Sequence, residues 1–280
     1  MKVAKKLIFD NLSPLYSKQE IDSISMLIFE KILDLSRFQV HLRQLETISA
    51  ANLTQIKEII NRLIQFEPIQ YILGETEFYG TVIKVNPAVL IPRSETEELV
   101  DWIIKDYQLL NPVILDIGTG SGCIPISIVK NIPGARAEGW DISTEALMVA
   151  KQNAENNNVQ VEFFYADILR QIHPTPKEKY DIIVSNPPYV TNSEKSLMLR
   201  NVTDYEPHIA LFVPDTDPLI FYRVIADLAL NLLLPNGRIY FEINEKFGNE
   251  LKDLLVLKGF RDITIRKDIN GRDRMVRAER

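Results

Sequence analysis

The chain has 280 residues, of which 46% are apolar and 25% are charged, and its net charge is −6. These are the proportions of a folded globular protein, and they exclude wholesale disorder. The length predicts one large domain or two smaller ones. A single cysteine, Cys123, excludes an intramolecular disulfide and a cysteine-based zinc site, and the three histidines lack the spacing of metal ligands. We therefore expect no metal centre.

The charge is spread unevenly along the chain. Residues 1–80 carry a net charge of −1, residues 81–260 carry −8 and residues 261–280 carry +3. The acidic bulk lacks the basic surface of a general nucleic-acid binder. No stretch reaches the ~18 apolar residues of a membrane helix, and the basic start is too short for a signal peptide. We expect a cytoplasmic monomer that contacts neither membrane nor nucleic acid.

Residues 1–73 are predicted to form a small helical bundle. Ser17 to Glu20 have the pattern of a capping box, and apolar residues follow at helical spacing. Asn52 is the predicted cap of a later helix, which should end before Pro68. Residues 74–92 read as a linker that contains a β-hairpin, with strands at 75–78 and 81–85 around Tyr79-Gly80.

Residues 93–280 alternate between helix and strand patterns. Ser94 and Glu97 predict a second capping box, which opens a helix through Tyr107. The predicted strands are residues 113–117, 137–140, 161–165, 181–185 and 238–243. Such alternation predicts an α/β domain with a parallel sheet and helices on both faces. Segments 263–268 and 274–278 flank Asn270-Gly271, so the sheet should finish with an antiparallel hairpin.

A glycine loop follows the first predicted strand of this domain. Its residues are Gly118, Thr119, Gly120, Ser121 and Gly122. Glycines let the backbone turn sharply and approach a ligand without a Cβ in the way. The alternative is a plain strand–helix turn, but strand, loop, helix and an acidic strand end follow one another in register. The segment therefore favours a nucleotide-like cofactor.

Three residues near this loop bear on the choice of cofactor. Asp141 ends the next strand, where a carboxylate can accept both ribose hydroxyls of an adenosine. Gly122 comes one residue earlier than the third glycine of a typical NAD site. Asp116, just before the loop, suits the ammonium group of S-adenosylmethionine, which has no pyrophosphate. These features favour a methyl donor over a dinucleotide.

The turn Asn186-Pro187-Pro188-Tyr189 follows the fourth strand directly. Its two prolines stiffen the turn and remove two N–H donors. The Asn186 side chain and the Pro187 carbonyl can accept both hydrogens of a planar NH₂ group, and Tyr189 can pack over its flat face. These contacts would stabilise the positive charge that grows on an amide nitrogen during in-line methyl transfer, so no strong base is needed beforehand.

The chain resembles the peptide chain release factor glutamine N5-methyltransferases along essentially its whole length. The resemblance rests on EPIQYILGETEFYG at 67–80, IPRSETEELV at 91–100, ILDIGTGSGC at 114–123, NPPY at 186–189, YEPHIAL at 205–211 and GRDR at 271–274. NPPY alone is shared with adenine-N6 DNA methyltransferases, so the whole set carries the identification. In this chain Ser94 stands where the family often has proline, and because serine can cap a helix there we expect no loss of function.

The resemblance implies a Rossmann-like class I methyltransferase domain behind a helical substrate-recognition domain. It implies methyl transfer from S-adenosylmethionine to the side-chain amide of the glutamine in the Gly-Gly-Gln loop of class I release factors. The implied cofactor residues are Asp116, Gly118, Thr119, Gly120, Ser121, Gly122, Asp141, Asp167, Ile168 and Asn186. The implied catalytic and substrate-binding residues are Asn186, Pro187, Pro188 and Tyr189. Roles for Arg93, Thr96, Glu97 and His208 stay unassigned.

Three other functions remain open at this point. A relative could methylate a glutamine of a ribosomal protein. An adenine-N6 nucleic-acid methyltransferase would need a basic cleft, against which the acidic bulk argues. A cofactor-binding regulatory module would have no use for an intact Asn-Pro-Pro-Tyr turn.

Overall fold

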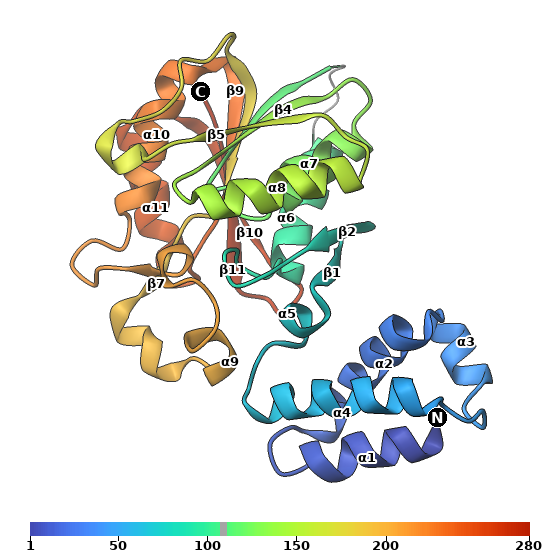
Figure 1. The fold of residues 1–280 in the computed structure, drawn as a ribbon. Helices are drawn as coiled ribbons and strands as arrows, with labels where there is room; N and C mark the ends of the chain where they lie inside the picture. Colours follow the sequence, from blue (N-terminus) through green and yellow to red (C-terminus); the bar gives the residue numbers. More distant parts are fainter. Residues whose placement is uncertain (107–110) are drawn as a thin grey trace. The chain divides into compact units, whose positions relative to one another are not determined.

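The computed structural model describes residues 1–106 and 111–280, which form two compact units (Figure 1). Unit 1 contains Met1–Gly74 and Leu199–Tyr205, and unit 2 contains Glu75–Met198 and Glu206–Arg280. The predicted hairpin thus groups with the second unit, and a short later segment groups with the first. The predicted helix end at Tyr107 lies outside the described residues.

Unit 1 is a bundle of amphipathic helices. They are α1 (Lys2–Leu12), α2 (Lys18–Leu33), α3 (Arg37–Leu42), α4 (Ala50–Ile64), α5 (Ile69–Leu73) and α9 (Arg200–Thr203). The predicted capping box of α2 is confirmed, since Ser17 accepts a hydrogen bond from the Glu20 N–H and the Glu20 side chain accepts one from the Ser17 N–H. The predicted cap at Asn52 is wrong: Ser49 caps α4 by accepting from the Asn52 N–H, so Asn52 is already inside the first turn.

The later segment of unit 1 is held by two contacts. The Tyr205 hydroxyl donates to the Gln65 carbonyl at 2.8 Å. The Arg200 guanidinium lies 4.7 Å from the centre of the Phe66 ring, a cation–π distance. These contacts attach residues 199–205 to the end of α4.

Unit 2 contains a twisted, mostly parallel sheet. Its strands are β3 (Val113–Ile117), β4 (Arg136–Asp141), β5 (Val161–Tyr165), β6 (Tyr180–Ser185), β9 (Leu233–Glu242), β10 (Arg261–Lys267) and β11 (Asp273–Glu279). In the described residues their order is β10-β11-β9-β6-β3-β4-β5. The strands from β9 to β5 pair in parallel, while β11 and β10 add the antiparallel hairpin that Asn270-Gly271 predicts. The predicted fold class is confirmed.

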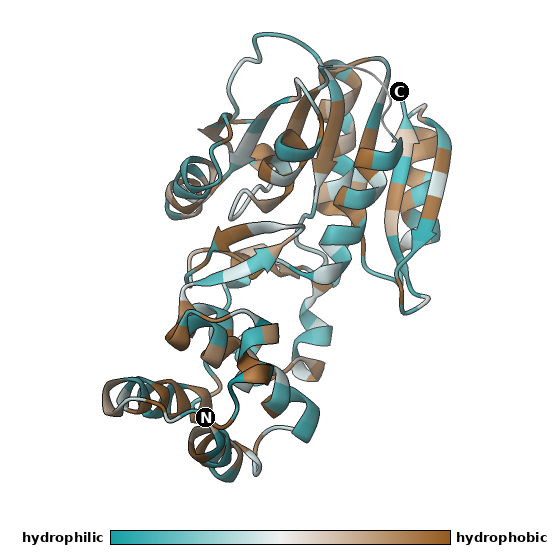
Figure 2. Ribbon diagram, turned by 90° about the vertical axis from the view of Figure 1, so that its right-hand side faces the viewer, coloured by the Kyte–Doolittle hydropathy of each residue, from teal (hydrophilic) through white to brown (hydrophobic). Residues whose placement is uncertain are grey.

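Helices cover both faces of this sheet, whose central strands are largely hydrophobic in Figure 2. One face carries α6 (Ser94–Asp106), α7 (Cys123–Asn131) and α8 (Thr144–Asn156), and the other carries α10 (Ile220–Leu232) and α11 (Gly248–Leu257). Shorter elements are η1 (Ile168–Arg170), β7 (Val190–Thr191), η2 (Asn192–Leu197), η3 (His208–Ala210) and β8 (Phe212–Val213). Burial on both faces explains why the central strands β3 and β6 read as nearly continuous apolar runs.

The strand order reverses at β3. The chain runs outward through β4 and β5, then returns to place β6 on the other side of β3. Loops at the carboxyl ends of β3 and β6 therefore diverge, and such a switch point leaves a crevice where ligands bind in open α/β sheets. Two motifs from the sequence, the glycine loop after β3 and the Asn-Pro-Pro-Tyr turn after β6, meet at this point.

The hairpin of β1 (Glu75–Phe78) and β2 (Thr81–Lys84) is fixed to the glycine loop by one buried amide. Asn153 accepts from the Lys84 N–H at 2.7 Å and donates to the Lys84 and Ser121 carbonyls at 3.0 and 2.9 Å. Glu97 takes part in the same arrangement by accepting from the Tyr79 N–H at 2.7 Å. The predicted capping box of Ser94 and Glu97 is wrong, because Ser94 is the first residue of α6 and not the residue before it.

Among the described residues, no helix combines the length and apolarity that crossing a bilayer requires.

We predict that Gly139→Ala destabilises unit 2. A Cβ at Gly139 would lie 2.7 Å from Phe163 Cδ1 and 2.8 Å from Thr119 Oγ1, because the Phe163 ring lies over this glycine on β4. Overpacking of this kind costs about 1–3 kcal/mol. Thermal unfolding should show a lower Tm than for the control Gly248→Ala, whose Cβ would meet its nearest neighbour at 3.5 Å. Equal Tm values would contradict this packing.

Candidate active site

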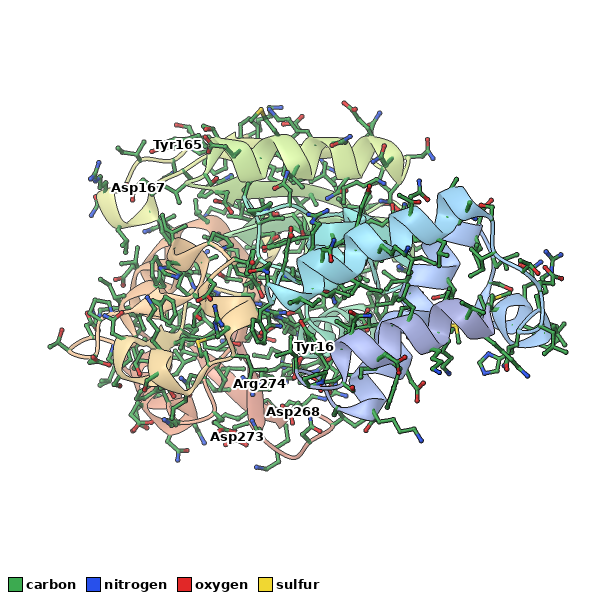
Figure 3. All side chains as sticks on the ribbon, turned by 60° about the horizontal axis from the view of Figure 1, so that its bottom comes forward. Tyr16, Tyr165, Asp167, Asp268, Asp273 and Arg274 are labelled. Atoms are coloured by element: carbon green, nitrogen blue, oxygen red, sulfur yellow. The ribbon has the colours of Figure 1, made fainter. Side chains whose placement is uncertain are left out.

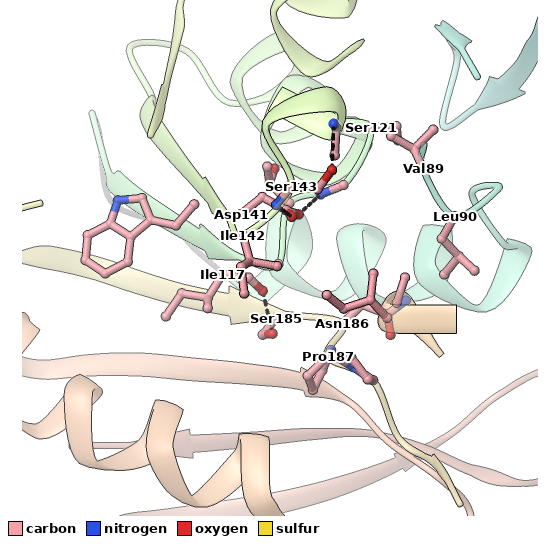
Figure 4. Close-up of a pocket in the computed structure, with 18 of the residues that line it drawn as sticks. Val89, Leu90, Ile117, Ser121, Asp141, Ile142, Ser143, Ser185, Asn186 and Pro187 are labelled. Carbon is pink, nitrogen blue, oxygen red and sulfur yellow. Dashed lines mark hydrogen bonds between the residues drawn. The ribbon is translucent and has the colours of Figure 1, made fainter. Parts of the chain in front are cut away.

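A cavity of about 210 Å³ opens at the switch point of unit 2 (Figure 4). The ends of four strands contribute to its wall: the glycine loop follows β3, Asp141 to Ser143 begin at the last residue of β4, Asp167 and Ile168 follow β5, and Asn186 to Pro188 follow β6. Pro92, Arg93 and Thr96 at the start of α6 close another side. All of these residues belong to unit 2, so the cavity is formed within one rigid framework of strands.

The glycine loop lines the cavity with its backbone. Gly118 and Gly120 have positive φ angles of 78° and 53°, which a β-carbon would strain. The N–H groups of Gly118 and Thr119 donate to the Trp140 carbonyl, which fixes the loop to β4. Thr119 and Ser121 also line the cavity.

Gly122 lies beneath the loop and does not line the cavity. An added Cβ would lie 3.1 Å from Ala150 Cβ and 3.2 Å from Phe163 Cζ. This glycine lets α7 pack closely against α8 and β5. A direct contact of Gly122 with a cofactor stays a prediction, and its structural role is close packing.

Asp116 is a fully buried carboxylate immediately behind the cavity wall. Neither of its oxygens has a hydrogen-bond partner among the described residues. Burial raises the pKa of this carboxyl to about 7, an effect that the neighbouring Thr119 hydroxyl partly offsets and the Asp141 charge adds to. Asp116 does not itself line the cavity, but Ile117 and Gly118, which follow it, do. A cation bound at this end of the cavity would relieve the cost of the buried charge.

Asp141 lies at the end of β4 and faces the cavity. Its Oδ2 accepts from the Gly120 N–H at 2.8 Å and its Oδ1 from the Ser143 N–H at 2.9 Å. Burial raises the pKa of this carboxyl, while the backbone hydrogen bonds act in the opposite direction. Each carboxylate oxygen can accept more than one hydrogen bond. Both oxygens therefore keep acceptor capacity for the two ribose hydroxyls, and this contact stays a prediction.

Asp167 and Ile168 follow β5 and line the cavity farther along the sheet edge. Figure 3 shows Tyr165 and Asp167 together at this strand end. Asp167 caps η1 by accepting from the Arg170 N–H at 3.2 Å. The indole of Trp140 stacks on the His173 ring at 5.3 Å between centroids and is fully buried. Ile142 and Ile168 are the apolar residues that line the cavity in this region.

The Asn-Pro-Pro-Tyr turn forms the opposite side. The Ser185 hydroxyl donates to the Ile117 carbonyl at 2.6 Å and so fixes the end of β6 to β3 (Figure 4). Asn186, Pro187 and Pro188 line the cavity. Tyr189 does not: its hydroxyl donates to Glu242 Oε1 at 3.0 Å, inside the domain. Packing of Tyr189 over a substrate amide therefore stays a prediction.

The sequence assigns no role to Thr96 and does not single out Glu242, and hydrogen bonds connect both to Asn186. Asn186 Nδ2 donates to the Thr96 hydroxyl oxygen at 3.2 Å, and the Thr96 hydroxyl donates to Glu242 Oε2 at 2.6 Å. Burial raises the pKa of the Glu242 carboxyl above its usual value, and hydrogen bonds from Thr96 and Tyr189 offset this rise only in part. One signal could have found Glu242, since it is the charged residue inside the otherwise apolar run at 239–243.

Two ion pairs shape the surroundings of the cavity. Arg93 donates to Glu206 Oε1 at 2.5 Å, while Glu206 Oε2 accepts from the Ile91 N–H at 3.1 Å. Arg274 pairs with Asp268 at 3.3 Å at the terminal hairpin, where both are labelled in Figure 3. The first pair links Glu206 to the segment before α6, and the second lies within the terminal hairpin. No group of His, Cys, Asp or Glu side chains within the described ranges is arranged to hold a metal ion.

We predict that Asp116→Asn stabilises the ligand-free protein. The carboxyl has a pKa of about 7 in the fold against 3.8 when solvated, so its charge destabilises the fold increasingly from about pH 4 to pH 7. At pH 8 the gain should reach roughly 4 kcal/mol at most, and at pH 5 it should be smaller. Thermal unfolding at both values measures it, with Asp10→Asn on the surface as the control. A Tm gain independent of pH would refute the buried charge.

Comparisons with known proteins agree with this geometry. Residues 15–74 match the family model described as PrmC N-terminal domain, and residues 96–203 match the one described as Methyltransferase small domain. The chain is 46% identical over 276 residues to a release factor glutamine methyltransferase of Bacteroides thetaiotaomicron, covering 98% of both chains. It is also 46% identical over 271 residues to one of Flavobacterium psychrophilum, covering 95% of this chain and 94% of that protein.

Solved structures support the fold. A methyltransferase of Pyrococcus furiosus superposes with a TM-score of 0.53 at 17% identity, covering 82% of this chain and 98% of that one. The T. thermophilus 16S rRNA N2 G1207 methyltransferase, solved with AdoMet and guanosine, gives the same TM-score and identity over 74% of this chain and 49% of its own. Given its identity to curated relatives over nearly the full length of both chains, this chain belongs to the release factor glutamine methyltransferase family.

Proposed function

We propose that this protein transfers a methyl group from S-adenosylmethionine to N5 of the glutamine in the Gly-Gly-Gln loop of class I release factors. The observation that carries the proposal is the Asn186 turn, because Asn186 and Pro187 line the cavity together with the glycine loop. Family membership supplies the acceptor class, since the near full-length relatives are named for this activity.

The residues on the other side of the cavity fit the methyl donor. When bound, S-adenosylmethionine supplies an electrophilic methyl group on a positively charged sulfur. The unpartnered Asp116 carboxylate favours a ligand with an ammonium group nearby. Asp141 offers acceptors for ribose hydroxyls, and the Ile168 region offers an apolar surface for a flat base. We propose that Gly118 to Ser121 line the path between these groups.

The Asn186 turn supplies the chemistry that an amide nucleophile needs. The lone pair of a glutamine amide is delocalised, so its nitrogen is a poor nucleophile. Acceptance of both N–H hydrogens by Asn186 Oδ1 and Pro187 O orients the nitrogen and stabilises the positive charge that develops on it. A nitrogen–carbon bond forms as the sulfur–carbon bond breaks, and one amide proton is then released to water. No side chain has to act as a strong base.

We further propose roles for the rest of the chain. The helical domain, residues 1–73, binds the release factor, and exposed apolar side chains such as Phe38, Leu42 and Leu45 support this. We propose that the enzyme works as a monomer in the cytoplasm, where release factors act, without direct contact with nucleic acid or membrane. The net charge of −8 over residues 81–260 supports a protein substrate over a phosphate backbone.

We predict that labelled methyl groups from S-adenosylmethionine enter a class I release factor. The protein is incubated with the donor and, separately, with a release factor, a ribosomal protein fraction and DNA. Label should enter the release factor and be lost when the Gly-Gly-Gln glutamine is replaced by alanine. Label in the ribosomal fraction or in DNA, and none in the release factor, would assign one of the alternative acceptors and sink the proposal.

We predict that Asn186→Ala lowers kcat by about 100-fold or more, because one of two acceptors for the developing charge is lost. Binding of S-adenosylmethionine, measured by calorimetry, should change little, since the glycine loop and Asp141 are untouched. The exposed Asn231→Ala serves as a control for the loss of a surface amide. Full turnover by the Asn186 variant would contradict the two-acceptor arrangement.

A further inference from the structure

A buried carboxylate lies directly beside the Asn186 turn. Ser185 pairs with Phe241 in the parallel register of β6 and β9, so the next residues, Asn186 and Glu242, end neighbouring strands. Glu242 is 1% exposed. It accepts hydrogen bonds from the Thr96 hydroxyl at 2.6 Å and from the Tyr189 hydroxyl at 3.0 Å. Burial of a carboxylate is costly, and both hydroxyls serve to offset that cost.

The directions of these hydrogen bonds determine how the Asn186 amide is turned. A threonine hydroxyl has one hydrogen and two lone pairs. The Thr96 hydroxyl gives its hydrogen to Glu242 Oε2. The Thr96 oxygen then faces Asn186, 3.2 Å away, as an acceptor. Only the NH₂ group of Asn186 can donate to it, and its Oδ1 must point the other way.

We propose that Glu242 and Thr96 are positioning residues that hold Asn186 Oδ1 toward the substrate and thereby select an amide over a carboxylate. This inference rests on the proposed function. An Oδ1 turned toward the substrate accepts from the NH₂ of glutamine. The same oxygen repels the carboxylate of glutamate, which has no hydrogen to donate. Without the hydrogen bond to Thr96, the Asn186 side-chain amide could rotate and exchange the positions of Oδ1 and Nδ2, and this selectivity would be lost.

Two substitutions of Thr96 separate this role from simple packing. Thr96 is 3% exposed, so its methyl group is part of a packed interior. Thr96→Val keeps the shape of the side chain and removes the hydroxyl. Thr96→Ser keeps the hydroxyl and removes the methyl group. A packing role predicts that serine is the more harmful change, whereas a positioning role predicts that valine is.

The test compares kcat of the whole 280-residue chain and of its variants with a release factor and S-adenosylmethionine as substrates. Thr96→Val should lower kcat by about 10- to 100-fold, the scale of a misplaced catalytic group, while Thr96→Ser should stay within about threefold of the original protein. The dissociation constant for S-adenosylmethionine should stay within about twofold for both variants. A kcat for Thr96→Ser equal to or below that of Thr96→Val would overturn the proposal.

A double-mutant comparison tests whether Glu242 acts through Thr96. Glu242→Gln should slow transfer by about tenfold alone, because its amide can donate to Thr96 and free that hydroxyl to turn toward Asn186 Oδ1. In the Thr96→Val background the same change should alter kcat by less than about twofold. Equal losses in both backgrounds, or no loss in the first, would overturn the role of Glu242. The Thr96 pair decides the proposal even if a Glu242 variant fails to fold.

Failure of this inference is distinguishable from failure of the proposed function. If the unaltered protein does not methylate the release factor glutamine, the proposed function is wrong whatever the variants do. If the unaltered protein does so and Thr96→Val keeps its kcat, the hydroxyl does not orient Asn186, and only the positioning role is refuted.

Discussion

The parallel pairing of β6 between β3 and β9 is the constraint on which the site depends. It brings the carboxyl ends of these strands together, so the glycine loop, the Asn186 turn and Glu242 come to one edge of the sheet. The Ser185 hydroxyl bond to the Ile117 carbonyl fixes the relative height of two of them. A change of register by one residue would turn Ser185 and Glu242 to the opposite face.

Two buried carboxylates serve opposite purposes in this framework. Glu242 has its partners within the domain, where it accepts hydrogen bonds from the Thr96 and Tyr189 hydroxyls. Asp116 has no hydrogen-bond partner among the described residues, and its raised pKa reflects the free-energy cost of burying its charge. Proteins often carry such local destabilisation at functional sites, where the bound ligand offsets it.

Much of this arrangement could be predicted from the sequence, because it rests on local patterns. The buried strands, the Ser17 capping box and the Asn270-Gly271 hairpin all follow from periodicity and turn chemistry. Two predicted helix caps were wrong. Ser49, three residues before Asn52, caps α4 in its place, and Glu97 accepts a hydrogen bond from the Tyr79 N–H rather than capping its own helix. Thr96 and Glu242 are 146 positions apart, and only the strand register and the start of α6 bring them to Asn186. No spacing rule along the chain relates such residues.

The central claim is that Asn186 and Pro187 together accept both hydrogens of a glutamine amide. A crystal structure of the enzyme with S-adenosylhomocysteine and a release factor tests it most directly. The account predicts that the glutamine nitrogen lies about 3 Å from both Asn186 Oδ1 and the Pro187 carbonyl oxygen, and in line with the donor sulfur. A glutamine nitrogen that contacts neither acceptor, or that lies outside the cavity between the glycine loop and the Asn186 turn, would contradict the account.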